Sequence, residues 1–72
     1  MDKKSMQQKI GSKIRQVRLE KEITQEELAT SIGKLREMLQ RIESGSVNPR
    51  IYMLREIAGG LGIPLEELLK GL

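Results

Sequence analysis

The sequence predicts an all-α fold, a compact five-helix bundle in which two short central helices are joined by a tight turn. Three observations support this prediction. Apolar residues recur at helical spacing in five segments, and no segment has the pattern of a strand. Glycines and prolines, which terminate helices, fall between these segments. The chain has 72 residues, the size of one domain with a small core.

The composition argues against several classes of function. The chain contains no Cys and no His, so it lacks thiolate chemistry, the commonest general base and the commonest metal ligand. We therefore expect no enzyme, no cofactor, no metal site and no small-molecule substrate. No apolar run is long enough to span a membrane, so we expect no membrane partner. The lack of Cys suits a reducing, cytoplasmic location.

The charge permits a polyanionic partner without requiring one. The formal net charge is +3 and the pI is about 9.5. The 13 Lys and Arg residues against 10 Asp and Glu residues also describe an ordinary solvated surface. One Tyr and no Phe or Trp leave no aromatic platform for stacking bases, which argues against binding of single-stranded nucleic acid.

The first helix is predicted over Gln7–Lys21, and residues 1–6 are predicted to form a flexible arm that precedes the folded domain, residues 7–72. The arm is either frayed, or it carries Lys3 and Lys4 along phosphates. The helical spacing places three residues in the core: Ile10, Ile14 and Val17.

The second helix is predicted over Gln25–Ile32. Thr24 is a good N-cap and Glu27 follows three residues later, which is the pattern of a capping box. Gly33 then closes the helix in a left-handed conformation. The apolar face of this helix has three members: Leu28, Ala29 and Ile32.

The third helix begins at Leu35 or Arg36 and ends at Glu43, before Gly45. Its predicted buried stripe consists of Leu35, Leu39 and Ile42. Two helices of about two turns joined at a glycine match the helix-turn-helix motif.

The opposite face of the third helix carries four long polar side chains: Arg36, Glu37, Gln40 and Arg41. Arg pairs well with guanine O6 and N7, and Gln with adenine N6 and N7, when a helix lies in the major groove of DNA. The same face is also consistent with a solvated ladder of i,i+4 side-chain pairs.

The remaining segments are a loop and two helices. Ser44–Pro49 has turn chemistry, and Val47 within it is expected to plug the core. A fourth helix is predicted over Arg50–Leu61 and a fifth over Leu65–Lys70. The apolar stripe of the fourth helix is Ile51, Leu54, Ile57, Ala58 and Leu61. The last segment has more leucines than a small core can bury, so they are either exposed or form an association surface: Leu65, Leu68, Leu69 and Leu72.

Residues 10–69 resemble the lambda-repressor-like, Cro-type helix-turn-helix family, also called the xenobiotic-response-element family. The segments that carry the resemblance are Ile10-Gly11, Ile14-Arg15, Val17-Arg18, Thr24 to Ala29, Arg41 to Gly45, Asn48-Pro49, Leu61 to Ile63 and Leu65 to Leu69. The resemblance implies a five-helix bundle that binds double-stranded DNA as a homodimer on a palindromic site. It also implies a transcriptional regulator, usually a bacterial or phage repressor.

The resemblance assigns roles to particular residues. It implies base contacts by Arg36, Glu37, Gln40 and Arg41. It implies phosphate contacts by Gln25, Asn48 and Arg50, and we expect Lys34 to contact phosphate as well. It also implies a largely buried structural ion pair between Arg18 and Glu43.

The chain departs from the family pattern at four positions. Lys34 and Leu35 replace an apolar residue and a Ser or Thr cap in the turn. Met38 stands where a small polar residue usually faces DNA, so it either touches thymine methyl groups or is buried beside Leu35. Glu22 stands where the family often has Gly. An alternative function is a protein-interaction module of antitoxin or adaptor type, with Leu35, Met38 and the final leucines as its contact surface.

Overall fold

The computed structural model describes residues 2–72, which form five helices and no strand within that range. The helices are α1 (Lys3–Glu20), α2 (Gln25–Ser31), α3 (Arg36–Glu43), α4 (Ile51–Leu61) and α5 (Leu65–Leu69). The expected all-α five-helix fold is therefore confirmed. No helix in the described part of the chain has the length and hydropathy needed to cross a membrane.

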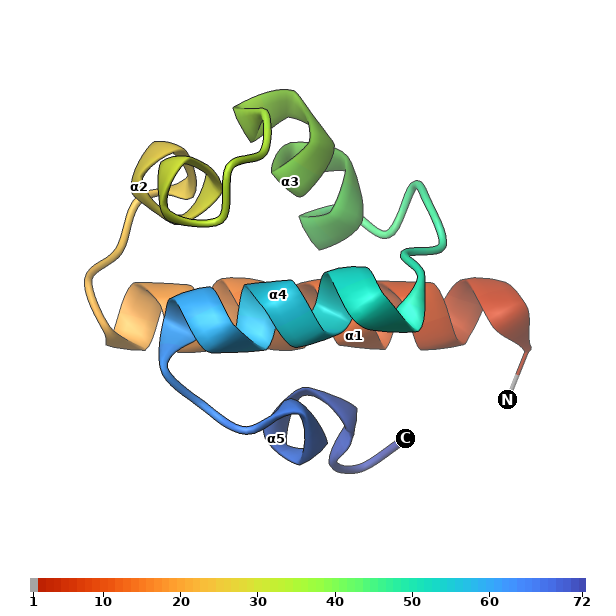
Figure 1. The fold of residues 1–72 in the computed structure, drawn as a ribbon. Coiled ribbons are helices and arrows are strands. Elements are labelled where there is room, and N and C mark those ends of the chain that lie inside the picture. Colours follow the sequence, from red (N-terminus) through yellow and green to blue (C-terminus); the bar gives the residue numbers. More distant parts are fainter. Residues whose placement is uncertain (1) are drawn as a thin grey trace.

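The helices α1 and α4 pack against each other across the middle of the molecule (Figure 1). The pair formed by α2 and α3 lies on one side of them, and α5 lies on the other. One hydrophobic core joins all five helices, and its fully buried large side chains are Ile14, Leu28, Ile57 and Leu68. This arrangement separates the helix-turn-helix from the C-terminal helix by a full layer.

The first helix begins earlier than the predicted Gln7, because α1 starts at Lys3 and so includes residues 3–6 of the expected arm. Asp2 caps the helix, and its carboxylate accepts a hydrogen bond from the backbone N–H of Ser5 at 2.7 Å. That hydrogen bond lowers the pKa of Asp2. Met1 lies outside the described residues. The sequence signal for this earlier helix start is the N-cap residue Asp2, which is followed by good helix formers. The spacing of apolar residues does not reveal it.

Two predicted core residues are exposed instead. The exposed fraction is 70% for Leu35 and 60% for Ile51. Leu35 is the N-cap of α3 and has extended backbone angles, so its side chain does not continue the inward stripe of Leu39 and Ile42. Ile51 is the first residue of α4, where Met53 takes the core position in its place.

The leucines of the C-terminal segment pack mostly inward. Leu68 is buried, and Leu65 and Leu69 are partly buried against the core. Only Leu72 is well exposed among the leucines of this segment. Most of these side chains therefore contribute to the chain's own core, and Leu72 stays exposed.

The predicted capping box is present at the start of α2. The Thr24 hydroxyl accepts from the backbone N–H of Glu27 at 3.0 Å, and the Glu27 carboxylate accepts from the backbone N–H of Thr24 at 2.8 Å. The second bond lowers the pKa of Glu27 from its ordinary value of 4.5. A lowered folded-state pKa means that the box stabilises the fold above that ordinary value and loses this contribution as the pH falls through the lowered one.

The α1–α3 contact depends on a glycine. Gly11 is buried where α1 meets the C-terminal end of α3, and a Cβ atom on it would lie 2.3 Å from the carbonyl oxygen of Ile42 and 2.6 Å from that of Glu43. Backbone atoms cannot move aside as a flexible side chain does. Any larger residue would therefore push α3 away from α1.

We expect Gly11→Ala to destabilise the fold by about 1–3 kcal/mol, because overpacking against backbone outweighs the better helix propensity of Ala. Gly59→Ala is the matched control, since Gly59 is also helical and has open space around its Cβ position. The control should gain about 0.5–1 kcal/mol. Urea unfolding followed by circular dichroism measures both. A stabilised Gly11→Ala variant would contradict the close approach.

The loop between α1 and α2 contains a strained residue. Glu22 has a φ of +58°, and it is the only non-glycine residue among those described with a positive φ. A side chain in this left-handed region clashes with its own backbone, whereas Gly adopts it without cost. The strain lies at the position where the resembled family often has Gly.

Glu22→Gly should stabilise the protein by about 1 kcal/mol, since relief of the strain exceeds the added entropy of the unfolded chain. Glu20→Gly is the same substitution two residues earlier, inside α1, and should cost up to about 1 kcal/mol. Thermal and urea unfolding of the two variants should shift in opposite directions. Equal shifts would show that the backbone at Glu22 is relaxed.

Candidate nucleic-acid interface

The helix α3 is anchored at its C-terminal end and projects outward at its N-terminal end. Its last turn contacts α1 at Gly11, while its first turn points away from the α1–α4 layer (Figure 1). The inward side of α3 carries Leu39, Ile42 and Glu43, all buried. The packed side of this short helix is therefore buried in the interior of the molecule.

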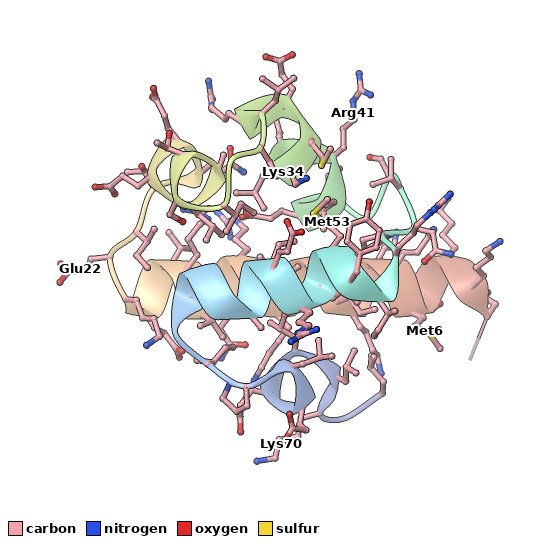
Figure 2. All side chains as sticks on the ribbon, viewed as in Figure 1. Met6, Glu22, Lys34, Arg41, Met53 and Lys70 are labelled. Atoms are coloured by element: carbon pink, nitrogen blue, oxygen red, sulfur yellow. The ribbon has the colours of Figure 1, made fainter. Side chains whose placement is uncertain are left out.

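The outward side carries the four predicted base-contacting residues, and each of them is exposed: Arg36, Glu37, Gln40 and Arg41. Figure 2 shows Arg41 projecting from α3 away from the body of the molecule. Within residues 2–72, none of the four side chains makes a hydrogen bond or an ion pair. The alternative ladder of i,i+4 pairs is therefore not formed, and these donors and acceptors are available to a partner.

A buried ion pair sets the position of α3, as the resemblance implied. The guanidinium of Arg18 donates to both carboxylate oxygens of Glu43, with Nε–Oε2 at 2.8 Å and Nη2–Oε1 at 3.0 Å. Each residue is only 7% exposed. The remaining guanidinium nitrogen, Nη1, donates to the carbonyl oxygen of Ile23 at 2.8 Å. Every buried side-chain nitrogen and oxygen of the described residues has a hydrogen-bond partner.

Gln25, a predicted phosphate contact, joins this ion pair. Its side-chain amide donates to Oε1 of Glu43 at 3.1 Å, and the residue is half-buried. The amide carries a second N–H, for which no acceptor occurs within residues 2–72. Gln25 therefore links the start of α2 to the end of α3 and still has one donor available for a phosphate.

The other predicted phosphate contacts lie at two different places along α4. Asn48 and Arg50 are exposed at the loop before α4, where they flank Pro49. Lys34 is half-buried and lies 3.8 Å from Glu56, from its Nζ to Oε2. Lys34 also lines a hollow with Gly59 and Gly60, toward the C-terminal end of α4, whereas Asn48 and Arg50 lie before the first residue of that helix.

A hollow of about 450 Å³ lies between α3 and α4. It brings together Arg41 and Arg50, two predicted contacts from different elements, with apolar side chains between them. Its lining residues include Leu35, Met38, Val47, Pro49, Tyr52 and Met53. The sequence did not indicate Tyr52, which lines this hollow and is 52% exposed, because nothing in its spacing marked it.

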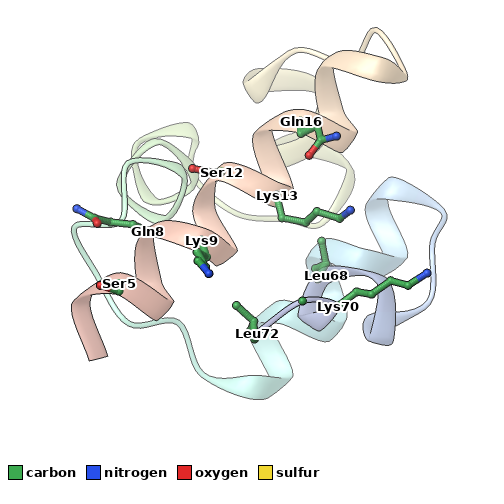
Figure 3. A pocket seen from close by; sticks show the side chains of 10 residues that line it. Ser5, Gln8, Lys9, Ser12, Lys13, Gln16, Leu68, Lys70 and Leu72 are labelled. Atoms are coloured by element: carbon green, nitrogen blue, oxygen red, sulfur yellow. The ribbon is translucent and has the colours of Figure 1, made fainter. Parts of the chain in front are cut away.

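A second hollow, of about 440 Å³, lies on the opposite side of the molecule between α1 and α5 (Figure 3). Polar side chains and three lysines line it: Lys9, Lys13 and Lys70. None of the predicted site residues lies there. No group of three or more acidic side chains within residues 2–72 is placed to hold a metal ion.

The helix-turn-helix family HTH_3 matches residues 14–68, which include the whole of α2, α3 and α4 and both members of the buried ion pair. This chain belongs to that family. The resemblance proposed from the sequence is therefore confirmed for most of the chain.

Helix-turn-helix relatives include the transcriptional repressor RstR of the cryptic phage CTXphi from Vibrio cholerae, which is 34% identical over 59 residues, covering 82% of this chain and 53% of the repressor. The HTH-type transcriptional regulator y4dJ of Sinorhizobium fredii is 36% identical and covers 89% of this chain and 83% of that protein. The chain thus spans about half the length of RstR. These relatives agree with the predicted class of transcriptional regulator.

Solved structures of the family superpose closely. The restriction-modification controller protein C.AhdI from Aeromonas hydrophila is 31% identical, with a TM-score of 0.84 over 86% of this chain and 94% of C.AhdI. The controller protein C.Esp1396I, solved as a tetramer on its natural 35 base-pair operator, is 33% identical, with a TM-score of 0.79 over 90% of this chain and 96% of that one.

Glu43→Gln should destabilise the fold by about 3–5 kcal/mol, because it leaves the buried charge of Arg18 without its counter-charge. Glu37→Gln is the matched control on the same helix. Its carboxylate is exposed and forms no ion pair with a described residue, so its effect should stay within about 0.5 kcal/mol. Urea unfolding measures both. Equal stabilities of the two variants would show that the pair does not hold α3.

Proposed function

We propose that this chain is a sequence-specific duplex DNA-binding transcriptional regulator of prokaryotic or phage repressor type, with α3 lying in the major groove. The observation that carries the proposal is the outward side of α3, where four long side chains that can hydrogen-bond to base edges are exposed. The buried ion pair holds this helix in place. Membership of a family of transcriptional repressors and operator-binding controllers supports it. Such a regulator acts on cytoplasmic DNA through binding rather than catalysis.

The proposed base contacts follow from hydrogen-bonding geometry. Arg36 and Arg41 present the bidentate donors that match guanine O6 and N7. Gln40 matches adenine N6 and N7, and Glu37 accepts from cytosine N4. We assign Asn48 and Arg50, with the second amide donor of Gln25, to phosphate oxygens beside the groove.

We further propose that two copies bind one palindromic operator. The molecule measures 31 × 22 × 21 Å. Half-sites read by helix-turn-helix dimers repeat at about 34–36 Å along the duplex, so two copies of this size fit side by side on one face of DNA. The oligomeric operator complex of C.Esp1396I is in keeping with this arrangement.

A protein-interaction module is the second candidate function, and the exposed Ile51 and Tyr52 at the start of α4 favour it. The two functions are separated by size-exclusion chromatography with and without DNA. Oligomerisation combined with no mobility shift of duplex DNA would support the interaction module over the regulator.

Selection from a random duplex library tests the main proposal directly. We expect a palindromic consensus, with log K falling linearly with log salt by about 0.9 for each phosphate contacted. Four to six contacts per subunit would give a steep dependence, by the same counterion-release relation. Undetectable or salt-independent binding to duplex DNA would refute the regulator.

Arg36→Ala should relax specificity at one base position at a cost of about 1–3 kcal/mol. Arg50→Ala should instead weaken binding to all sequences alike and lower the salt slope by about 1. Lys70→Ala is the control, because it removes the same charge from the residue that follows α5, on the opposite side of the molecule from α3 (Figure 2). Fluorescence anisotropy at several salt concentrations measures all three. A Lys70→Ala variant that binds as weakly as Arg50→Ala would place the DNA elsewhere.

A further inference from the structure

Two apolar side chains are exposed at the outer end of α3. Leu35, the N-cap residue, is 70% exposed, and Met38, in the first helical turn, is 38% exposed. Both line the rim of the hollow between α3 and α4, next to Glu37 and Arg41. The apolar pair Leu35–Met38 is therefore continuous with the polar side of α3.

The apolar residue at the start of α3 lowers the stability of the fold. Leu35 makes no side-chain cap hydrogen bond to α3, although a Ser or Thr at this position would stabilise the helix start by about 1 kcal/mol. Exposure of a large apolar side chain in water brings no compensating burial within the described chain. An apolar residue at this position therefore does not stabilise the fold through any contact within the described chain.

The N-terminal residues of a recognition helix are the ones that reach base edges. The only apolar group that a base presents in the major groove is the C5-methyl of thymine. We propose that Leu35 and Met38 form an apolar surface that packs on thymine methyl groups, so that the operator half-site requires thymine beside the bases read by the polar side of α3. This inference rests on the proposed function and adds part of its sequence preference.

Charge favours DNA over a second copy of the chain as the occupant of this surface. Arg41 and Arg50 border the hollow, and Glu37 is the only acidic residue that lines it. A second copy related by a two-fold axis would bring these arginines toward one another, whereas phosphates would neutralise them. The whole chain also carries a formal charge of +3.

The test replaces thymine by deoxyuridine, one position at a time, in the operator obtained by selection. This change removes only the methyl group and leaves every hydrogen bond of the base intact. At one or two positions in each half-site we expect binding to weaken about fourfold, the value of one buried methyl group. Equal affinity for all thymine and deoxyuridine operators would overturn the inference while leaving the regulator intact. A failure to select any operator would instead refute the proposed function.

Variants assign the effect to the two side chains. Leu35→Ala or Met38→Ala should bind the thymine operator about fourfold more weakly and lose most of the thymine–deoxyuridine difference. Leu19→Ala, at an exposed leucine on α1, is the matched control and should keep the full difference. Unfolding curves of the three variants verify that they are folded. A variant at Leu35 that keeps the full difference but loses self-association would overturn the inference and assign the surface to a second copy.

Discussion

The buried ion pair between Arg18 and Glu43 fixes how α1, α2 and α3 are placed relative to one another. One guanidinium binds the carboxylate at the end of α3 and the carbonyl oxygen of Ile23 before α2, and the amide of Gln25 binds the same carboxylate. The end of α3 is therefore joined at one point to α1 and to the start of α2. A buried pair of this kind contributes little net stability, since desolvation offsets its attraction, but it strongly disfavours any other arrangement of the same segments.

The close approach at Gly11 complements the ion pair. Hydrogen bonds fix the direction of α3, while the missing side chain at Gly11 fixes its distance from α1. Both constraints act on the last turn of α3, so the first turn is left to project. A short helix held at one end presents its opposite end to solvent at a defined angle, which is what insertion into a groove of DNA requires.

Helices and most of the core were predictable because they depend on local spacing and on short-range caps. The capping box at Thr24 and the inward stripe of α3 beyond Leu35 are examples of such local signals. The exposure of Leu35 and Ile51 at two helix starts was not predictable, because both residues are apolar as core residues are, but their backbone positions turn them outward. The orientation of the Gln25 side chain was not predictable either, since it depends on a carboxylate 18 residues away.

The division of α3 into an anchored side and an outward side also bears on how new binding preferences arise. The ion pair, the close approach and the apolar contacts all use one side of the helix, so exchange of outward residues leaves folding nearly unchanged. Duplicated copies of such a chain can diverge in the DNA they recognise without passing through unstable intermediates. The buried scaffold can therefore stay constant while a few outward side chains of α3 are exchanged.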